Sequence, residues 1–365
     1  MTMRLRLLPG GVALLVLAGV VLTLPAIANA QKAEKPKKPK ADSASIPPFF
    51  TSETPLAVTF TANFGRLRTN KSDAAPWRYA SMAYAGADGK TVTVPMRAKT
   101  HGIWRLKNCV IPPIRLNVSN KEAKHTLFHD MQKPKMVSVC RKNDGYEQYV
   151  LKEMQLYRIY QTITPISHRV RTLRVTYTDS ASGNVEATRY AFLIEDPDEL
   201  AARLGGEMTK TKGAGAGDME PDALAVAYIF EYFIGNLDFS FNGLHNTELV
   251  LKTDGSLALP IAYDFDFSGA VNASYATVDP QFRSKRVTER IFRGYCAIMS
   301  SYPAAIALFQ QKKDAIYALY RDDVGKLLDP DIVRESLAYF DDFYEVVKTP
   351  SDAQANVLNR CVGPR

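Results

Sequence analysis

The chain has 365 residues, of which 46% are hydrophobic and 23% are charged, and its formal net charge is +8 at pH 7. These proportions exclude a disordered or low-complexity protein and are typical of a globular chain with one large or two ordinary domains. Basic charge alone does not indicate a nucleic-acid binder. The sequence contains no recognised nucleic-acid-binding motif, so no nucleic-acid partner is expected.

The N-terminus has the three parts of a secretory signal peptide. Two arginines precede a nearly continuous apolar run over residues 12–24, and small residues suited to cleavage follow at 28–30. The apolar run is shorter than the ~20 residues that span a bilayer. We therefore expect a signal peptide over residues 1–30, cleaved near Ala30, and a periplasmic or secreted mature protein. An uncleaved N-terminal anchor is the alternative.

Residues 31–50 begin with lysines that alternate with proline and glutamate. A segment of this composition cannot bury a core, so a flexible linker is expected here. Its positive charge would also permit peripheral contact with an anionic envelope surface.

From residue 51 to residue 200 the pattern is mainly that of β-strands, because apolar residues alternate with small or polar ones. Strands are expected at 56–60, 79–84, 92–96, 114–118, 135–139, 171–178 and 188–194. The one convincing helix of this half covers 145–163, where two apolar stripes recur at steps of three and four residues. Glu153 lies within one of these stripes, and an acid in an apolar face requires a buried partner.

From residue 201 to residue 365 the pattern is mainly helical. A glycine-rich loop covers 205–217, and Pro221 is well placed to begin an apolar helix that extends to residue 234. Two further helices are expected at 304–320 and 332–347.

Four cysteines are present: Cys109, Cys140, Cys296 and Cys361. None belongs to a Cys-x-x-Cys pair, which argues against a zinc ribbon or a thioredoxin-type motif. In an oxidising compartment an even number of cysteines is compatible with two disulfides. Of the three possible pairings we expect Cys109 with Cys140 and Cys296 with Cys361, because these join near neighbours within each half. Buried free thiols are the alternative.

Acids and amides gather at loop positions of the second half. Asp238 and Asn246 follow the apolar helix, and Asp264 and Asp266 follow a short strand. The hairpin between these loops would bring them to one edge, where their oxygens would suit Mg²⁺ or Mn²⁺. If the last two acids lie on extended chain, both face one way and the phenylalanine between them faces the core.

Several segments resemble those of one protein family. Residues 263–269 read Tyr-Asp-Phe-Asp-Phe-Ser-Gly, and residues 89–102 resemble a strand that ends in an Arg-x-Arg-Gly turn. Residues 114–116 resemble the basic strand that follows, and 190–196 a strand that enters an interlobe hinge. Together these features resemble the spore-coat-protein-H (CotH) family of secreted atypical kinases, in particular exported bacterial proteins that carry the Tyr-Asp-Phe-Asp-Phe-Ser-Gly box. The resemblance covers about residues 56–294.

The resemblance implies an α+β, two-lobed protein-kinase-like fold, with a β-rich N-terminal lobe over 51–200 and a helical C-terminal lobe over 201–365. It also implies ATP and a divalent metal as cofactors. Residue by residue it implies a catalytic acid at Asp238, metal ligands at Asn246, Asp264 and Asp266, the helix glutamate at Glu153, and a phosphate-binding cation at Arg115 or Lys135. No Gly-x-Gly-x-x-Gly loop is present, so any cover over the phosphates must be of another kind.

These features predict an exported, metal- and ATP-dependent kinase or nucleotidyl transferase that acts, as a monomer, on a hydroxyl of a protein or glycan. Two other functions fit the same acids. One is a catalytically inactive binding module of the envelope, and the other is a metal-assisted hydrolase of an envelope substrate. The chain has no Gly-x-Ser-x-Gly motif, which argues against an esterase.

Overall fold

The computed structural model describes residues 46–364, apart from 70, 71, 73, 103 and 142. The predicted signal peptide and residues 31–45 of the predicted linker therefore lie outside the described residues. The end of that linker is ordered, because Pro48–Thr51 forms a 3-10 helix and Phe49 is fully buried. The described residues belong to one compact unit that covers 40–365.

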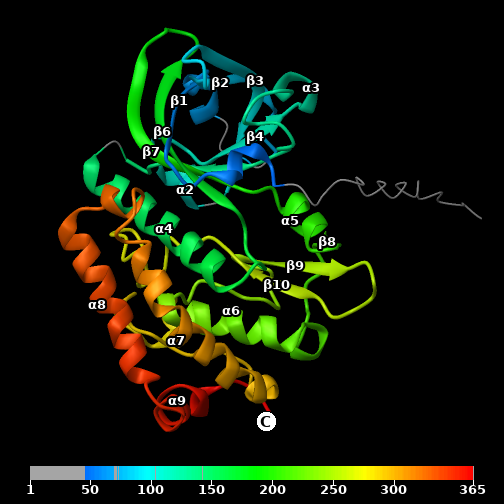
Figure 1. Ribbon diagram of the computed structural model, residues 1–365, viewed down its shortest axis with the longest axis vertical. Helices are drawn as coiled ribbons and strands as arrows, with labels where there is room; N and C mark the ends of the chain where they lie inside the picture. Colours follow the sequence, from blue (N-terminus) through cyan, green and yellow to red (C-terminus); the bar gives the residue numbers. More distant parts are fainter. Residues whose placement is uncertain (1–45, 70–71, 73, 103, 142, 365) are drawn as a thin grey trace, which may run out of the picture. The chain divides into compact units, whose positions relative to one another are not determined.

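Seven strands close into a barrel in the order β1-β2-β3-β4-β5-β7-β6 (Figure 1). Their bounds are β1 Leu56–Ala62, β2 Arg78–Ala85, β3 Thr91–Thr100, β4 Ile114–Val118, β5 Lys135–Val137, β6 Val170–Asp179 and β7 Val185–Ile194. Six neighbouring pairs are antiparallel, and the parallel pairing of β1 with β6, with Leu56 opposite Leu173, closes the barrel. Alternate residues of β1 are buried, which confirms the predicted alternation.

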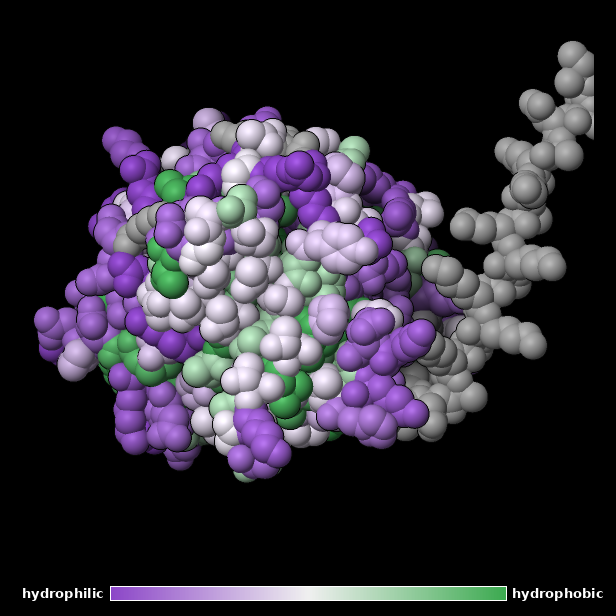
Figure 2. Space-filling view, turned by 90° about the horizontal axis from the view of Figure 1, so that it is seen from above, coloured by the Kyte–Doolittle hydropathy of each residue, from purple (hydrophilic) through white to green (hydrophobic). Residues whose placement is uncertain are grey.

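The apolar side chains of the strands are directed into the barrel, where Phe60, Leu173 and Phe192 are fully buried. Figure 2 views the molecule from above and shows hydrophilic residues surrounding a paler, more apolar central area.

A second, three-stranded antiparallel sheet has the order β10-β9-β8. Its strands are β8 Gly206–Thr209, β9 Thr247–Lys252 and β10 Leu259–Ala262. β10 contacts helix α6, and β8 contacts helix α5.

Nine α-helices lie within the described part of the chain. Their bounds are α1 Phe64–Thr69, α2 Trp104–Asn108, α3 Asn120–Ala123, α4 Asp144–Ile163, α5 Pro197–Arg203, α6 Pro221–Ile234, α7 Tyr302–Ala318, α8 Pro330–Val346 and α9 Pro350–Asn356. Helix α4 lies between the barrel and the C-terminal helices, with β6 and β7 on one side and α7 on the other (Figure 1). It begins after Asn143, whose side chain accepts a hydrogen bond from the Tyr146 amide. None of the described helices combines the length and the apolar character needed to cross a bilayer.

The prediction of a two-lobed, protein-kinase-like fold is wrong. The strands form a closed seven-stranded barrel of mixed direction, and the second half contains a three-stranded sheet as well as helices. One hydrophobic core cluster extends from Phe49 to Leu358 without a break between the halves. The error arose because periodicity identifies strands but not their partners, and the parallel β1–β6 pair joins segments far apart in the chain.

The predicted disulfides are confirmed. Cys109 is bonded to Cys140, and Cys296 is bonded to Cys361. The first bond joins the end of α2 to the turn before α4, and the second joins the segment before α7 to the C-terminal region. Both are compatible with an extracellular or periplasmic protein.

Candidate active site

The β9–β10 hairpin brings two polar loops together, as the sequence predicted. Ala262 is paired with Thr247, and the Tyr263 amide donates a hydrogen bond of 3.2 Å to the Asn246 carbonyl. Both Asn246 and Asp264 have left-handed backbones, with φ of 50° and 63°. Asn and Asp adopt this conformation more readily than other residues with side chains, which explains their presence at these positions.

Asp238 is held in the loop that follows α6. Its carboxylate is hydrogen-bonded to His245 Nε2 at 2.8 Å, and Asn246 Nδ2 donates to it at 3.0 Å. The Asn246 amide also donates to the Asp238 carbonyl at 2.7 Å. Arg293 donates to the carbonyls of the residues before and after Asp238, both at 2.8 Å. Asp238 and Asn246 are therefore one hydrogen-bonded unit.

A buried acidic cluster lies beside this unit. Carboxylate oxygens of Glu153, Asp264 and Asp266 lie within 4.8 Å of one another. Burial raises the pKa of Glu153 to about 8, and burial and the neighbouring Asp266 raise the pKa of Asp264 to about 6. The negative charge of Asp238 also raises the pKa of Asp264, so the two carboxylates interact electrostatically.

Phe265 faces the core as predicted, although the backbone around it is not extended. It is fully buried, and its ring centroid lies 4.6 Å from that of Tyr157. The Tyr157 hydroxyl in turn accepts a hydrogen bond of 2.8 Å from the Asp264 amide. β10 ends at Ala262, so the left-handed turn at Asp264, rather than strand alternation, directs the two acids.

Sequence reasoning did not identify Arg105, the cation of the cluster. From helix α2 it donates to Glu153 Oε2 at 2.5 Å and, through Nε, to Asp266 Oδ2 at 2.8 Å. Burial acts to lower the pKa of Arg105, but Asp266 and Glu153 raise it well above its usual value. The disulfide was the signal that could have found it, because pairing Cys109 with Cys140 brings α2 to the start of the helix that carries Glu153.

The two predicted phosphate-binding cations have other partners. Lys135 lies 3.6 Å from Glu248 and 4.4 Å from the ring centroid of Tyr263, and Arg115 lies 3.2 Å from Asp196. Glu153 is therefore paired with Arg105 and with neither of the two predicted cations. Lys135 nevertheless lies close enough to Asp264 to lower its pKa.

The cations Lys135, Arg115 and Arg105 lie close enough to His101 to act on its pKa. Burial, followed by the charges of Lys135, Arg115 and Arg105 in that order, lowers the pKa of His101 to about 3. Its imidazole is neutral at physiological pH, and the buried Nε2 atom has no hydrogen-bond partner. An acidic cluster thus stands next to a group of cations and a buried imidazole.

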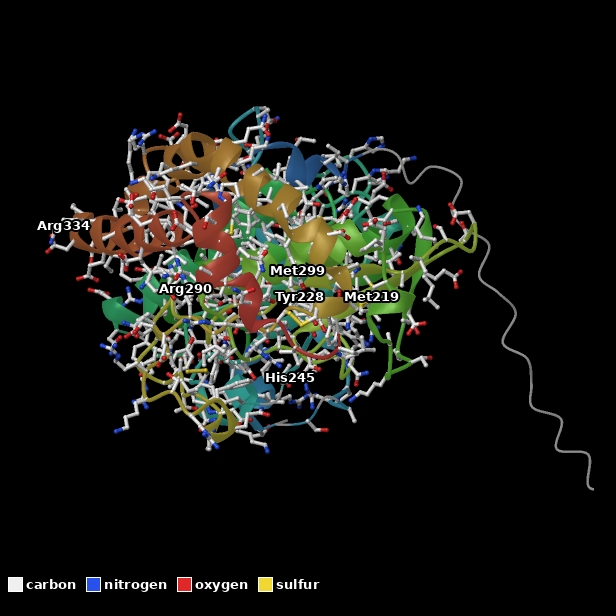
Figure 3. The ribbon with its side chains drawn as sticks, turned by 90° about the horizontal axis from the view of Figure 1, so that it is seen from below. Met219, Tyr228, His245, Arg290, Met299 and Arg334 are labelled. Carbon is white, nitrogen blue, oxygen red and sulfur yellow. A yellow bond between two sulfur atoms is a disulfide. The ribbon has the colours of Figure 1, made fainter. Side chains whose placement is uncertain are left out.

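A cavity of about 560 Å³ adjoins Asp238. Its lining combines polar side chains with aromatic rings, among them Asp238, His245, Arg293, Phe239, Phe267 and Phe282. His245 is labelled in Figure 3. The side chains of Asp238 and His245 are 40% and 58% exposed, so molecules in solution can reach both.

No protein-family model and no curated protein matches this chain.

Proposed function

We propose that this protein is an exported, metal- and ATP-dependent phosphotransferase related to the spore-coat-protein-H family. The observation that carries the proposal is the convergence of Asp238, Asn246 and Asp264. Asp238 and Asn246 are hydrogen-bonded to each other on the loop that follows α6, and the β9–β10 hairpin returns the chain so that Asp264 lies at the same edge. Lys135, which lies close enough to Asp264 to lower its pKa, is the cation that could contact the phosphates of ATP in addition to Glu248.

The residues can be assigned roles in transfer of a phosphoryl group to a hydroxyl. Asp238, half-exposed in the cavity, would orient the acceptor and take its proton. The acceptor oxygen would then form a bond to the terminal phosphorus of ATP, and the bond from that phosphorus to the bridging oxygen would break to release ADP. His245 and Asn246 would position the Asp238 carboxylate.

The oxygen atoms of the site fit a divalent cation. Asn246 uses its amide nitrogen to bind Asp238, so its amide oxygen is the atom that could face a metal. Asp264 supplies a carboxylate, and the buried Glu153 Oε1 has no hydrogen-bond partner. These are hard ligands of the kind that Mg²⁺ and Mn²⁺ prefer. A bound cation would neutralise charge on the nucleotide phosphates.

One observation favours a second function, a binding module without catalysis. Arg105 already bridges Glu153 and Asp266, so its guanidinium occupies carboxylate oxygens that a metal ion would otherwise bind. In that case the acids would hold the fold together through Arg105.

Thermal unfolding of the purified protein with and without ATP and Mn²⁺ tests the proposal. At a ligand concentration a hundredfold above its dissociation constant, we expect about 2.7 kcal/mol of added stability. The gain should require both ligands and should disappear in Asp264→Asn, which keeps a residue that tolerates the left-handed backbone but removes the charge. Asp130→Asn is the matched control, because exposed Asp130 also has a positive φ of 64°.

The absence of a shift in the unaltered protein, with both ligands in excess, would contradict the phosphotransferase and leave the binding module. Turnover of a phosphorylated or glycosidic substrate without nucleotide would instead favour a metal-assisted hydrolase.

A further inference from the structure

Five aromatic side chains meet beside the acidic cluster. They are Trp104 from α2, Tyr146 and Tyr149 from the first turns of α4, and Phe267 and Tyr275 from the segment after β10. The ring of Tyr275 is stacked on both Trp104 and Tyr146, with ring centroids 4.8 Å and 6.1 Å apart. We call these five residues the aromatic cluster.

The aromatic cluster lies at the edge of the core, against which Tyr149 and Tyr275 pack. Trp104 is 37% exposed, and the other four rings are only partly buried. Phe265, two residues before Phe267, is fully buried by contrast. Partly exposed aromatic rings that form one contiguous apolar patch are a common feature of ligand-binding surfaces.

Phe267 connects the aromatic cluster to the cavity of Asp238. Its ring centroid lies 5.8 Å from those of Trp104 and Tyr275, and the same residue lines the cavity. A ligand bound on the aromatic cluster could therefore extend into the cavity and reach the Asp238 carboxylate.

We infer that the acceptor is a glycan, bound with sugar rings against the aromatic cluster and one sugar hydroxyl at Asp238. This inference rests on the proposed function. The transfer is the one given above, with a sugar hydroxyl giving its proton to Asp238 and its oxygen bonding to phosphorus.

The mixture of side chains favours a sugar. A pyranose has C–H faces that pack on aromatic rings and hydroxyls around its edge that need hydrogen-bond partners. The cavity offers both, with Phe239 and Phe282 beside Asp238 and Gln281, and its volume suits a small-molecule site. An extended peptide would instead gain from an open strand edge, and none of the cavity's lining residues belongs to a strand of the two sheets.

Intrinsic fluorescence can test the site without nucleotide or metal. The chain has two tryptophans, Trp77 and Trp104, so Trp77→Phe leaves Trp104 as the only reporter. In this background we expect a saturable change in emission with at least one of the cello-, chito- and malto-oligosaccharides. Tyr275→Ala should weaken binding roughly tenfold or more, by analogy with bases stacked on aromatic rings.

Tyr275→Phe, which keeps the ring, should retain binding. Tyr79→Ala, which removes an 80% exposed tyrosine from the barrel, should not affect it. A second measurement follows the transfer of radiolabelled phosphate from ATP to the bound oligosaccharide, with a serine-containing peptide mixture for comparison. Transfer to the sugar supports the inference.

Two results would overturn the inference: no emission change with any oligosaccharide at millimolar concentration, or transfer to the peptides alone. Saturable sugar binding that depends on Tyr275, in a protein that ATP and Mn²⁺ do not stabilise, would support the sugar site. That result would overturn the proposed phosphotransferase function and leave the sugar site standing. Failure of the sugar site is therefore distinguishable from failure of the proposed function.

Discussion

Replacing Arg105 by methionine should lower the free energy of unfolding by about 3–5 kcal/mol. The guanidinium bridges Glu153 and Asp266, whose side chains are only 1% and 6% exposed. Without it, the buried carboxyls of Glu153 and Asp266 would face each other and the half-buried Asp264 without their ion-pair partner. Urea unfolding at neutral pH measures the loss, and Arg105→Lys should recover only part of it, because an ammonium cannot reproduce the planar two-sided contact.

Arg334→Met is the matched control for this substitution. Arg334, labelled in Figure 3, forms an ion pair of 2.8 Å with Asp331, but both side chains are more than 70% exposed. Exposed pairs of this kind have little effect on stability, so the urea midpoint should not change measurably. If Arg105→Met were as harmless as Arg334→Met, the acidic cluster would not depend on its guanidinium.

Glu231→Gln should remove a large part of the pH dependence of stability. Glu231 lies on α6, is 1% exposed, and neither of its carboxyl oxygens has a hydrogen-bond partner. Burial raises its pKa to about 8 from an ordinary value of 4.5. Between these two pH values the folded state retains a proton that the unfolded state has released, so the free energy of unfolding falls as the pH rises.

We expect the unaltered protein to lose about 3–4 kcal/mol more than Glu231→Gln between about pH 5 and pH 8. Well above pH 8 both proteins should follow parallel curves, because the Glu231 carboxyl is then ionised in both the folded and the unfolded state. Unfolding midpoints recorded across the pH range provide the measurement, and Glu122→Gln, at an exposed position of α3, is the control. Parallel curves for Glu231→Gln and the unaltered protein from pH 5 to pH 8 would contradict the assignment.

Local structure was largely predictable from the sequence. The helix expected at 145–163 is α4, Asp144–Ile163, and the strand expected at 114–118 is β4. These predictions succeeded because each rests on a short-range pattern, the spacing of apolar residues that face a common core. The disulfides were predictable for a similar reason, since each joins cysteines within one half of the chain.

Within the candidate site, the sequence indicated the acids and Asn246 but only part of how they meet. The hairpin between Asn246 and Asp264 was visible as a turn between two short apolar runs. The partner of Glu153 was not, because Arg105 belongs to a short helix in the β-rich half with no periodic pattern of its own. Lys135 was the more obvious candidate for the partner of Glu153, because it lies on the strand before the helix. In the structure it pairs with Glu248 instead.

The sequence by itself was enough to predict the longer strands and helices and to indicate the disulfide pairs. The tertiary structure alone decided that the strands close into one barrel, because parallel pairing of β1 with β6 depends on contacts between distant segments. It also decided that Arg105 lies among the buried acids. Buried charges require a partner, but which cation reaches them depends on how the helices and the barrel pack.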